Sequence, residues 1–196
     1  MKKIIVNLGC GKTRIPGSTG VDVVKIKNYV DIVHDLDVTP YPFKNNSIDE
    51  VHLYHVLEHL HEPIKKVEEI HRILKPGGLL YLRVPHFSSV GAFMDITHVR
   101  PFSVYSFDCF AKDTYHHFYT SVVFEVVERR IKYFGLYPNS GIYEKYIHHN
   151  QCVWFVKPYV RFIDFMIGLS PTFFERFWCY LVGGATEVCI TLKKSR

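Results

Sequence analysis

Short apolar runs, rich in β-branched side chains and bounded by turn-forming residues, recur through the first part of the chain. They cover residues 4–8, 20–24, 31–35, 48–54 and 79–84. Runs of this length between glycine, proline, asparagine and aspartate are typical of buried strands. We therefore predict five strands in this region.

One segment between these strands has helical periodicity instead. From Pro63 to Leu74 apolar residues recur every three or four positions, with charged residues on the opposite side. The following Lys75-Pro76-Gly77-Gly78 sequence is a strong helix-ending signal. We expect an amphipathic helix over residues 63–74 and a strand that begins at residue 79.

Two connections between the predicted strands are unusually short. The first lies between Gly11 and Val21 and contains Pro16 and Gly17, and the second, residues 25–30, is shorter still. A parallel crossover that includes a helix needs at least about 10–12 residues. Strands that alternate with connections indicate an α/β protein with a mostly parallel sheet. We expect one face of that sheet to be thinly covered.

The pattern changes after Pro85. Residues 103–112 are predicted to be a helix that begins at Ser103, because serine is a favourable N-cap residue. Two further strands are predicted at residues 122–132 and 186–193.

Aromatic residues are concentrated before the last predicted strand. Residues 133–185 contain half of the chain's aromatic side chains, and segments 159–166 and 173–181 place them at helical spacing. Three roles remain open for these predicted helices. They could form a lid over a binding site, a surface that contacts a membrane or lipid, or packing in the core and at a homodimer interface.

Composition limits the class of protein. The chain has 196 residues, of which 47% are apolar, enough for one domain with a hydrophobic core. The net charge is +5, and lysine and arginine are scattered rather than clustered in a basic stripe. We therefore expect no nucleic-acid partner.

Cysteine use and hydropathy bear on the compartment. The five cysteines are an odd number, widely spaced, and form no Cys-x-x-Cys pair. This favours reduced thiols in the cytoplasm over a disulfide framework. The N-terminal apolar stretch is too short for a signal peptide, and no run of 18 apolar residues predicts a membrane span.

The first predicted strand leads into a turn with two glycines, in the sequence Asn-Leu-Gly-Cys-Gly at residues 7–11. Glycine lets the backbone approach a ligand without a Cβ atom in the way. Asp22 follows Gly11 by eleven residues, in the second predicted strand, where a carboxylate can accept hydrogen bonds from a ribose diol. Ligands of such sheets bind beyond the carboxyl ends of the strands.

The type of nucleotide can be narrowed further. A dinucleotide site requires Gly-x-Gly-x-x-Gly and the N-terminus of a helix for the pyrophosphate. Arg14 occupies the third glycine position here, and the connection has no room for the helix. A nucleoside without phosphates therefore fits better.

Taken together and in this order, these motifs resemble the class I S-adenosylmethionine (SAM)-dependent methyltransferases, in particular the type 11 group with a short Asn-Leu-Gly-Cys-Gly motif. The resemblance covers residues 4–134 and also rests on Asp35-Leu36 and on segments 47–51, 55–60 and 72–78. It implies a Rossmann-like, mostly parallel sheet with an antiparallel last strand, SAM as cofactor, and methyl transfer. One domain is expected over 1–196, with a core of 1–134 and 186–196 and a helical, aromatic-rich insertion at 135–185.

The resemblance also assigns residues to the cofactor. Four groups are implied, from the methionine part of SAM through the ribose and the adenine to the neighbourhood of the sulfonium: Asn7, Leu8, Gly9, Cys10 and Gly11; Asp22 and Val23; Asp35 and Leu36; and Leu53, Tyr54 and His55. Asp35 could instead belong to a simple polar turn.

A second chemistry is possible at His55-Val56-Leu57-Glu58-His59, which matches the His-x-x-Glu-His pattern of inverted zinc peptidases. Two histidines four apart on a helix, with an adjacent glutamate, could hold zinc. However, the segment directly follows a strand, and Pro63 limits any helix to about two turns. We therefore expect no metal and keep the metallopeptidase as the lesser alternative.

The polar segment after the fifth predicted strand contains the candidate residues for the acceptor. The resemblance places the segment that contains Asp95, Arg100 and Phe102 toward the substrate. Arg100 could hold an anionic group of the substrate, or it could be a surface charge. His98 could act as general base because its ordinary pKa is near neutrality, or it could simply hydrogen-bond the loop. His86 is a second candidate base.

The sequence thus predicts a cytoplasmic SAM-dependent methyltransferase. The expected acceptor is a hydroxyl or an amine of a small molecule, with sugars and lipid-linked metabolites as candidates. A SAM-binding module without catalysis is the main alternative.

Overall fold

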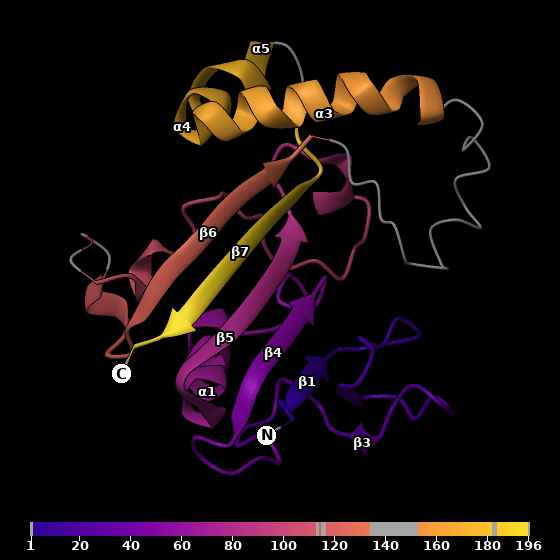
Figure 1. Cartoon of the computed structure of the whole chain (residues 1–196), viewed down its shortest axis with the longest axis vertical. Helices are drawn as coiled ribbons and strands as arrows, with labels where there is room; N and C mark the ends of the chain where they lie inside the picture. The colour runs from indigo at the N-terminus through magenta and orange to yellow at the C-terminus, as the bar shows by residue number, and fades with distance from the viewer. Residues whose placement is uncertain (1, 113, 115–116, 134–152, 182–183, 196) are drawn as a thin grey trace.

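The computed structural model describes residues 2–112, 114, 117–133, 153–181 and 184–195. Its centre is a seven-stranded sheet with the order β3-β2-β1-β4-β5-β7-β6 (Figure 1). The strands are β1 (Ile5–Leu8), β2 (Thr19–Asp22), β3 (Ile32–Val33), β4 (Ile48–Tyr54), β5 (Leu74–Pro85), β6 (Phe124–Lys132) and β7 (Glu187–Lys194).

The direction of the strands follows the prediction. The first five strands pair in parallel, whereas β7 is antiparallel to both β5 and β6. The predicted α/β sheet, mostly parallel with an antiparallel last strand, is therefore confirmed.

The predicted helix is present as α1 (Pro63–Ile73), with Val67, Ile70 and Ile73 fully buried. The strand that follows begins earlier than predicted, since β5 starts at Leu74 and not at residue 79. The pairing of β5 with β4 shifts register within this stretch, and Gly77 has a φ of 80° there. The proline and glycines thus end the helix as expected, but they form an irregularity inside the strand and not a separate loop.

The two short connections contain no helix, as predicted. Residues 9–18 and 23–31 are described throughout and consist of turns and bends. The first connection nevertheless returns the chain to β2 beside β1, and the second returns it to β3 beside β2, in both cases in parallel. Val23 and Val24 are exposed directly after β2, so this edge of the sheet lies close to the surface.

The core lies between α1, the sheet and the segment after β5. The largest side chains that are almost completely buried include Leu8, Leu53, Ile70, Leu82 and Phe124. Each contributes roughly 1.5–3 kcal/mol relative to an exposed position. A polar contact closes one end of this core, because Lys194 Nζ in β7 donates to the carbonyl oxygens of His71 (2.7 Å) and Leu74 (2.9 Å). The ammonium therefore satisfies free carbonyl groups at the end of α1.

The predicted helix over residues 103–112 is wrong. The segment consists of turns and a short 3-10 helix at Asp108–Phe110. The serine side chains bond to the local backbone, since the main-chain nitrogen of Tyr105 donates to Ser103 Oγ (3.1 Å) and that of Ser103 donates to Ser106 Oγ (2.9 Å). Such bonds compete with helical hydrogen bonds and favour turns.

The aromatic-rich insertion is helical where it is described. It contains α3 (Val153–Leu169), α4 (Pro171–Phe173), a π-helical turn (Phe174–Trp178) and α5 (Cys179–Leu181), which lie together beyond one end of β6 and β7 (Figure 1). The part of the insertion at 135–152 lies outside the described residues. None of the helices in the described part of the chain is both long enough and apolar enough to cross a membrane.

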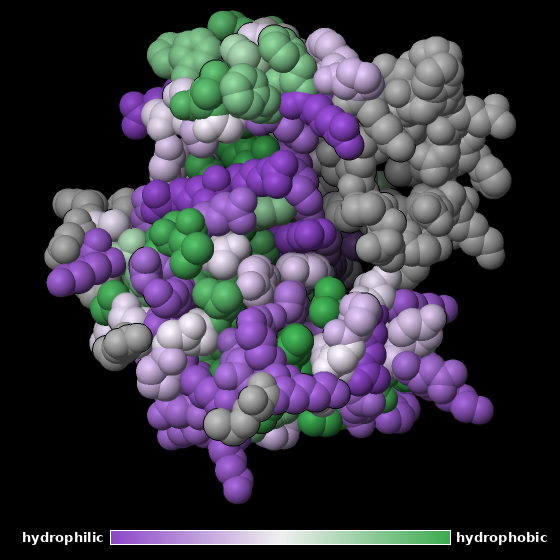
Figure 2. All heavy atoms as spheres, viewed as in Figure 1, coloured by the Kyte–Doolittle hydropathy of each residue, from purple (hydrophilic) through white to green (hydrophobic). Residues whose placement is uncertain are grey.

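These helices bury only one side. Ile163, Ile167 and Phe174 are buried, and Figure 2 shows apolar atoms gathered on the outer surface over α3–α5. The large apolar side chains exposed there are Tyr159, Phe162, Phe165, Met166, Leu169, Phe173, Phe177, Tyr180 and Leu181.

Candidate functional site

The glycine turn after β1 has two glycines with different surroundings. Gly9 and Gly11 both have positive φ values, 65° and 48°. A Cβ atom at Gly9 would collide with the side chain of Val56, whereas nothing lies within 4 Å of the same position at Gly11. Gly9 therefore lets the turn pack against the loop after β4, and Gly11 leaves open space beside the backbone.

Asp22 lies at the carboxyl end of β2, next to this open turn. Its Oδ2 accepts a hydrogen bond from the main-chain nitrogen of Gly11 (2.8 Å), and its Oδ1 accepts one from Val24 (3.3 Å). Each carboxylate oxygen keeps a further lone pair. The turn and the carboxylate are thus brought together as predicted, and Val23 is exposed beside them.

The other residues assigned to the first motif have buried side chains, so any contact with a ligand in the turn is left to their main chain. Asn7, Leu8 and Cys10 are buried, so their side chains face the protein interior. Cys10, Cys109, Cys179 and Cys189 form no disulfide, and Cys152 lies outside the described residues. For the described cysteines this agrees with the prediction of free thiols.

Asp35 and Leu36 follow β3 at the same edge of the sheet. Asp35 Oδ1 accepts a hydrogen bond from the main-chain nitrogen of Asp37 (2.9 Å), and Leu36 is buried. This is the polar turn that the sequence left open as an alternative. Contact with an adenine ring stays a prediction.

Leu53 and Tyr54 end β4 and point to opposite faces of the sheet. Leu53 is buried in the core. The Tyr54 ring lies under the Arg83 guanidinium, 4.4 Å from the ring centroid, and its hydroxyl is 2.8 Å from His52 Nδ1.

His55 is held between two buried carboxylates. Its Nε2 lies 2.9 Å from Glu187 Oε1, and its Nδ1 lies 3.4 Å from Glu58 Oε1. Burial alone would lower the pKa of His55, but its contacts with the two carboxylates, the hydrogen bond to Glu187 first among them, outweigh it and raise the pKa to about 9. Both ring nitrogens of His55 face carboxylates and the 55–60 segment consists of turns, so His55 and His59 do not form the helical zinc pair that the His-x-x-Glu-His pattern suggests.

The loop that contains Asp95 and His98 packs against the loop after β4. The main-chain nitrogen of Val99 donates to the carbonyl oxygen of Glu58 (2.8 Å), and His98 Nδ1 lies 3.3 Å from the carbonyl oxygen of Ala92. Asp95 Oδ1 accepts from Thr97, and this hydrogen bond lowers the pKa of Asp95. Asp95 is exposed at this edge.

Arg100 and Phe102 lie on the other side of that loop. They line, together with Leu57 and Tyr105, a cavity of about 450 Å³ beside α1. Phe102 is buried and stacks on Phe107, with ring centroids 5.6 Å apart. A role for both residues in acceptor binding stays a prediction.

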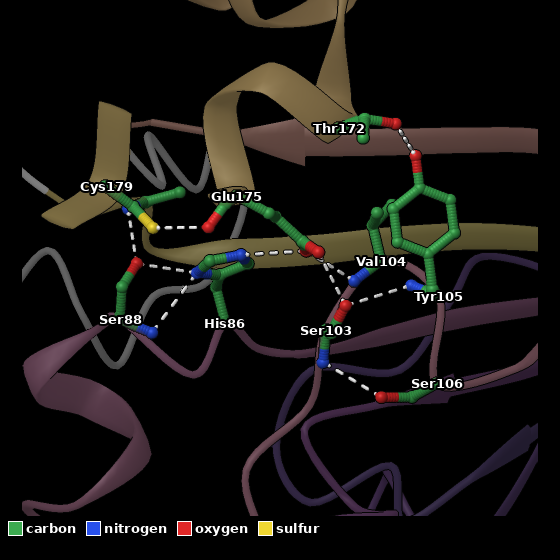
Figure 3. A network of polar contacts seen from close by, with 10 residues as sticks. His86, Ser88, Ser103, Val104, Tyr105, Ser106, Thr172, Glu175 and Cys179 are labelled. Carbon is green, nitrogen blue, oxygen red and sulfur yellow. Dashed lines mark hydrogen bonds and ion pairs between the residues drawn. The ribbon is translucent and has the colours of Figure 1, made fainter. Parts of the chain in front are cut away.

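His86 is completely buried in a closed polar network (Figure 3). Its Nδ1 lies 2.6 Å from Ser88 Oγ and its Nε2 lies 3.1 Å from Glu175 Oε1. Glu175 also accepts hydrogen bonds from Ser103 Oγ (2.6 Å) and from the main-chain nitrogen of Val104 (2.7 Å). Both ring nitrogens of His86 are in use and its ring has no exposed surface, and a catalytic role for it stays a prediction.

Several partners in these networks were not expected from the sequence. Glu175 and Glu187 reach His86 and His55 from distant parts of the chain, and no local motif marks them. A buried glutamate beside a histidine marks such a pair, and this proximity is visible in the folded structure and not in the sequence.

Comparisons with known proteins agree with this arrangement. A family model described as a methyltransferase domain matches residues 18–82, about a third of the chain. No curated protein sequence matches the chain.

Solved structures match over almost the whole chain. A chain of the complex between the Trm112 methyltransferase activator and a methyltransferase of Haloferax volcanii is 17% identical, with a TM-score of 0.56 over 99% of this chain and 83% of that one. A SAM-dependent methyltransferase from Archaeoglobus fulgidus is 16% identical, with a TM-score of 0.52 over 98% and 86%. The [4+2]-cyclase SpnF is 18% identical, with a TM-score of 0.52 over 98% and 74%.

At these identities the structural likeness shows the fold. The family match is to a methyltransferase domain over residues 18–82, and both findings agree with the resemblance that the sequence shows to the SAM-dependent methyltransferases.

Proposed function

We propose that this chain transfers the methyl group of SAM to a hydroxyl or an amine of a small molecule. The observation that carries the proposal is the open main chain at Gly11 beside the carboxylate of Asp22, at the carboxyl ends of β1 and β2. A nucleoside without phosphates fits this combination, because the turn offers unobstructed backbone and Asp22 keeps acceptor sites for a ribose diol.

The remaining cofactor contacts follow the order of the strands. The main chain of the turn at 9–11 would meet the methionine part, Asp35 and Leu36 the adenine, and residues 53–55 the neighbourhood of the sulfonium. Bound SAM supplies an activated methyl group. The contribution of the protein is then alignment of the acceptor with the methyl group. Alignment lowers the activation barrier by several kcal/mol, because the translational and rotational entropy of the acceptor is already lost when it binds.

His98 is the best candidate for a group that takes a proton from an acceptor hydroxyl. A carbonyl oxygen can only accept, so the contact with Ala92 fixes the proton on Nδ1 and leaves the lone pair of Nε2 available. His86 lacks such a free nitrogen in this conformation. Asp95 and Arg100, on the same loop as His98, are the candidates for orienting the acceptor.

The exposed apolar surface over α3–α5 favours a lipid-linked acceptor or an apolar protein partner, such as a second copy of the chain (Figure 2). Buried aromatic groups dominate the energetics of interfaces of either kind. Lysine and arginine form no single basic stripe in the sequence, which disfavours a large nucleic acid.

The second candidate function is SAM binding without methyl transfer. The likeness to a [4+2]-cyclase supports this candidate, because it shows that a protein with this fold can carry a different activity. The two functions share the cofactor site and differ in the need for a proton acceptor.

Calorimetry with SAM tests the cofactor site. Asp22→Ala should weaken SAM binding roughly 10- to 100-fold, because hydrogen bonds to a charged acceptor contribute about 1.5–3 kcal/mol each. Glu125→Ala, at an exposed position in β6, is the control and should leave the affinity unchanged. Equal affinity for SAM in the Asp22→Ala and control proteins would contradict the assignment.

Turnover is measured separately, as formation of S-adenosylhomocysteine with a panel of sugars, lipid-linked sugars and amines. Methyl transfer to any of them supports the enzyme, and SAM binding without product across the panel supports the second candidate.

A further inference from the structure

Three side chains from two loops converge beside the predicted cofactor edge: Glu58 and His59 from the loop after β4, and His98 from the loop after β5. One potential metal-ligating atom of each lies within 4.8 Å of the other two. The rings of His59 and His98 meet edge to face, with centroids 4.6 Å apart. This cluster contains no member of the closed network around His86.

Glu58 is the unusual member of the cluster. Its side chain is 1% exposed, yet neither carboxylate oxygen has a hydrogen-bond partner among the described residues. The cation beside it is His55, whose Nδ1 lies 3.4 Å from Oε1. Burial of a carboxylate without hydrogen bonds costs several kcal/mol, so such groups in proteins are usually paired or bind a metal.

Both histidines, His59 and His98, are oriented by a hydrogen bond at the same ring nitrogen, Nδ1. Thr97 Oγ1 donates to Asp95 Oδ1 (2.7 Å), so it accepts from His59 Nδ1 (2.8 Å). His98 Nδ1 donates to the carbonyl oxygen of Ala92. In each ring the proton is therefore on Nδ1 and the lone pair on Nε2, the arrangement in which metal-binding histidines are normally held.

The two loops are fixed relative to each other and to the cofactor turn. The hydrogen bond from Val99 to the carbonyl oxygen of Glu58 joins the loops, and Val56 packs directly on Gly9. His59 and His98 are half-buried, so the cluster is open to solvent on one side while Glu58 forms its floor.

We propose that Glu58, His59 and His98 bind a divalent transition-metal ion of the zinc type. Two imidazoles and one carboxylate form a common ligand set for zinc sites that keep a position open for water or substrate. Ligands about 2.1 Å from a tetrahedral ion are ~3.4 Å apart, so the side chains need to close by roughly an ångström.

The site gives a specific role to this edge of the protein, although that role rests on the proposed methyl transfer. An ion held by His98 occupies the lone pair that would otherwise accept a proton. The metal ion would instead bind the oxygen of the acceptor and lower the pKa of the acceptor's hydroxyl group. The metal site itself is independent of that function.

Titration of the chelator-treated full chain with Zn²⁺, followed by calorimetry, tests the site. Co²⁺ titration followed by visible absorption reports the coordination. Glu58→Gln, His59→Gln and His98→Gln should each weaken binding at least about 100-fold, and Thr97→Val about 10-fold. His61→Gln is the matched control, because His61 is exposed on the same loop and contacts Asp37 instead.

Circular dichroism and thermal unfolding confirm that each variant is folded. The proposal is overturned if the three ligand variants bind Zn²⁺ as tightly as the His61→Gln protein, or if the wild type binds none. Asp22→Ala should lose SAM and keep the metal, and His59→Gln should do the opposite, so failure of the metal site and failure of the cofactor site are distinguished.

Discussion

Two histidine clusters at the carboxyl edge of the sheet contain similar residues in opposite states. In the first, the buried His86 and Glu175 satisfy each other and the backbone around them (Figure 3). In the second, Glu58 is equally buried but has only the longer contact with His55 (3.4 Å), and within the described residues His59 and His98 each use only Nδ1 in a hydrogen bond. A completed network holds a fold together, whereas an incomplete one at a surface opening is available for a ligand.

The largest effect is expected from breaking the completed network. Glu175→Ala removes the acceptor for His86, Ser103 and Val104, and leaves their donors buried. We expect a loss of about 3 kcal/mol in the free energy of unfolding, measured by urea denaturation. The exposed Glu125→Ala should change it by less than about 0.5 kcal/mol. A loss no larger than that of the control would show that the network contributes little.

Completing the second cluster should stabilise the protein. Zinc at 100 times its dissociation constant adds about 2.7 kcal/mol to the free energy of unfolding, provided that the unfolded chain does not bind it. The same concentration should leave the melting temperature of His98→Gln unchanged. A similar rise in both proteins would mean that zinc binds elsewhere.

A smaller effect is expected in the free energy of unfolding at acid pH, and it tests the completed network around Glu175. Burial alone would raise the pKa of Glu175, but the hydrogen bonds from His86, Ser103 and Val104 outweigh it and hold the pKa below its ordinary value. Stability from this carboxylate is therefore present above pH 4.5 and is lost as the pH falls below it. Wild-type protein should lose stability more steeply than Glu175→Gln in this range, and parallel profiles would contradict the assignment.

The smallest effect is expected for the metal-free second cluster. His98 is half-buried and its ring makes one long hydrogen bond, so His98→Gln should change the free energy of unfolding by less than about 0.5 kcal/mol. Chemical denaturation in the presence of chelator measures it. A large loss would make His98 a structural residue.

The sequence predicted what depends on local pattern. The strand positions, α1 and the approach of Asp22 to the glycine turn follow from periodicity, β-branched runs and glycine spacing. The helix predicted over residues 103–112 is wrong because serine side chains accept hydrogen bonds from main-chain nitrogens of this segment and so favour turns. Propensity alone does not reveal that competition.

The site was predictable only in part, for a different reason. Glu58 and His59 were noticed as half of a zinc motif, but their partner in the structure is His98, from another loop, and not His55. His55 is hydrogen-bonded to Glu187, a residue far along the chain, and does not join His59. Contacts of this kind are decided by the order of strands in the sheet, which a linear pattern does not contain.

The position of β7 has a consequence for how the molecule is made. This strand follows the whole aromatic-rich insertion in sequence, yet it lies between β5 and β6. During synthesis the hydrogen-bonding groups along one side of β5 must wait, unpaired, until residues 187–194 have left the ribosome. Pairings between such distant segments form slowly, and waiting strand edges invite aggregation. We therefore expect the nascent chain to depend on chaperones until that strand is inserted.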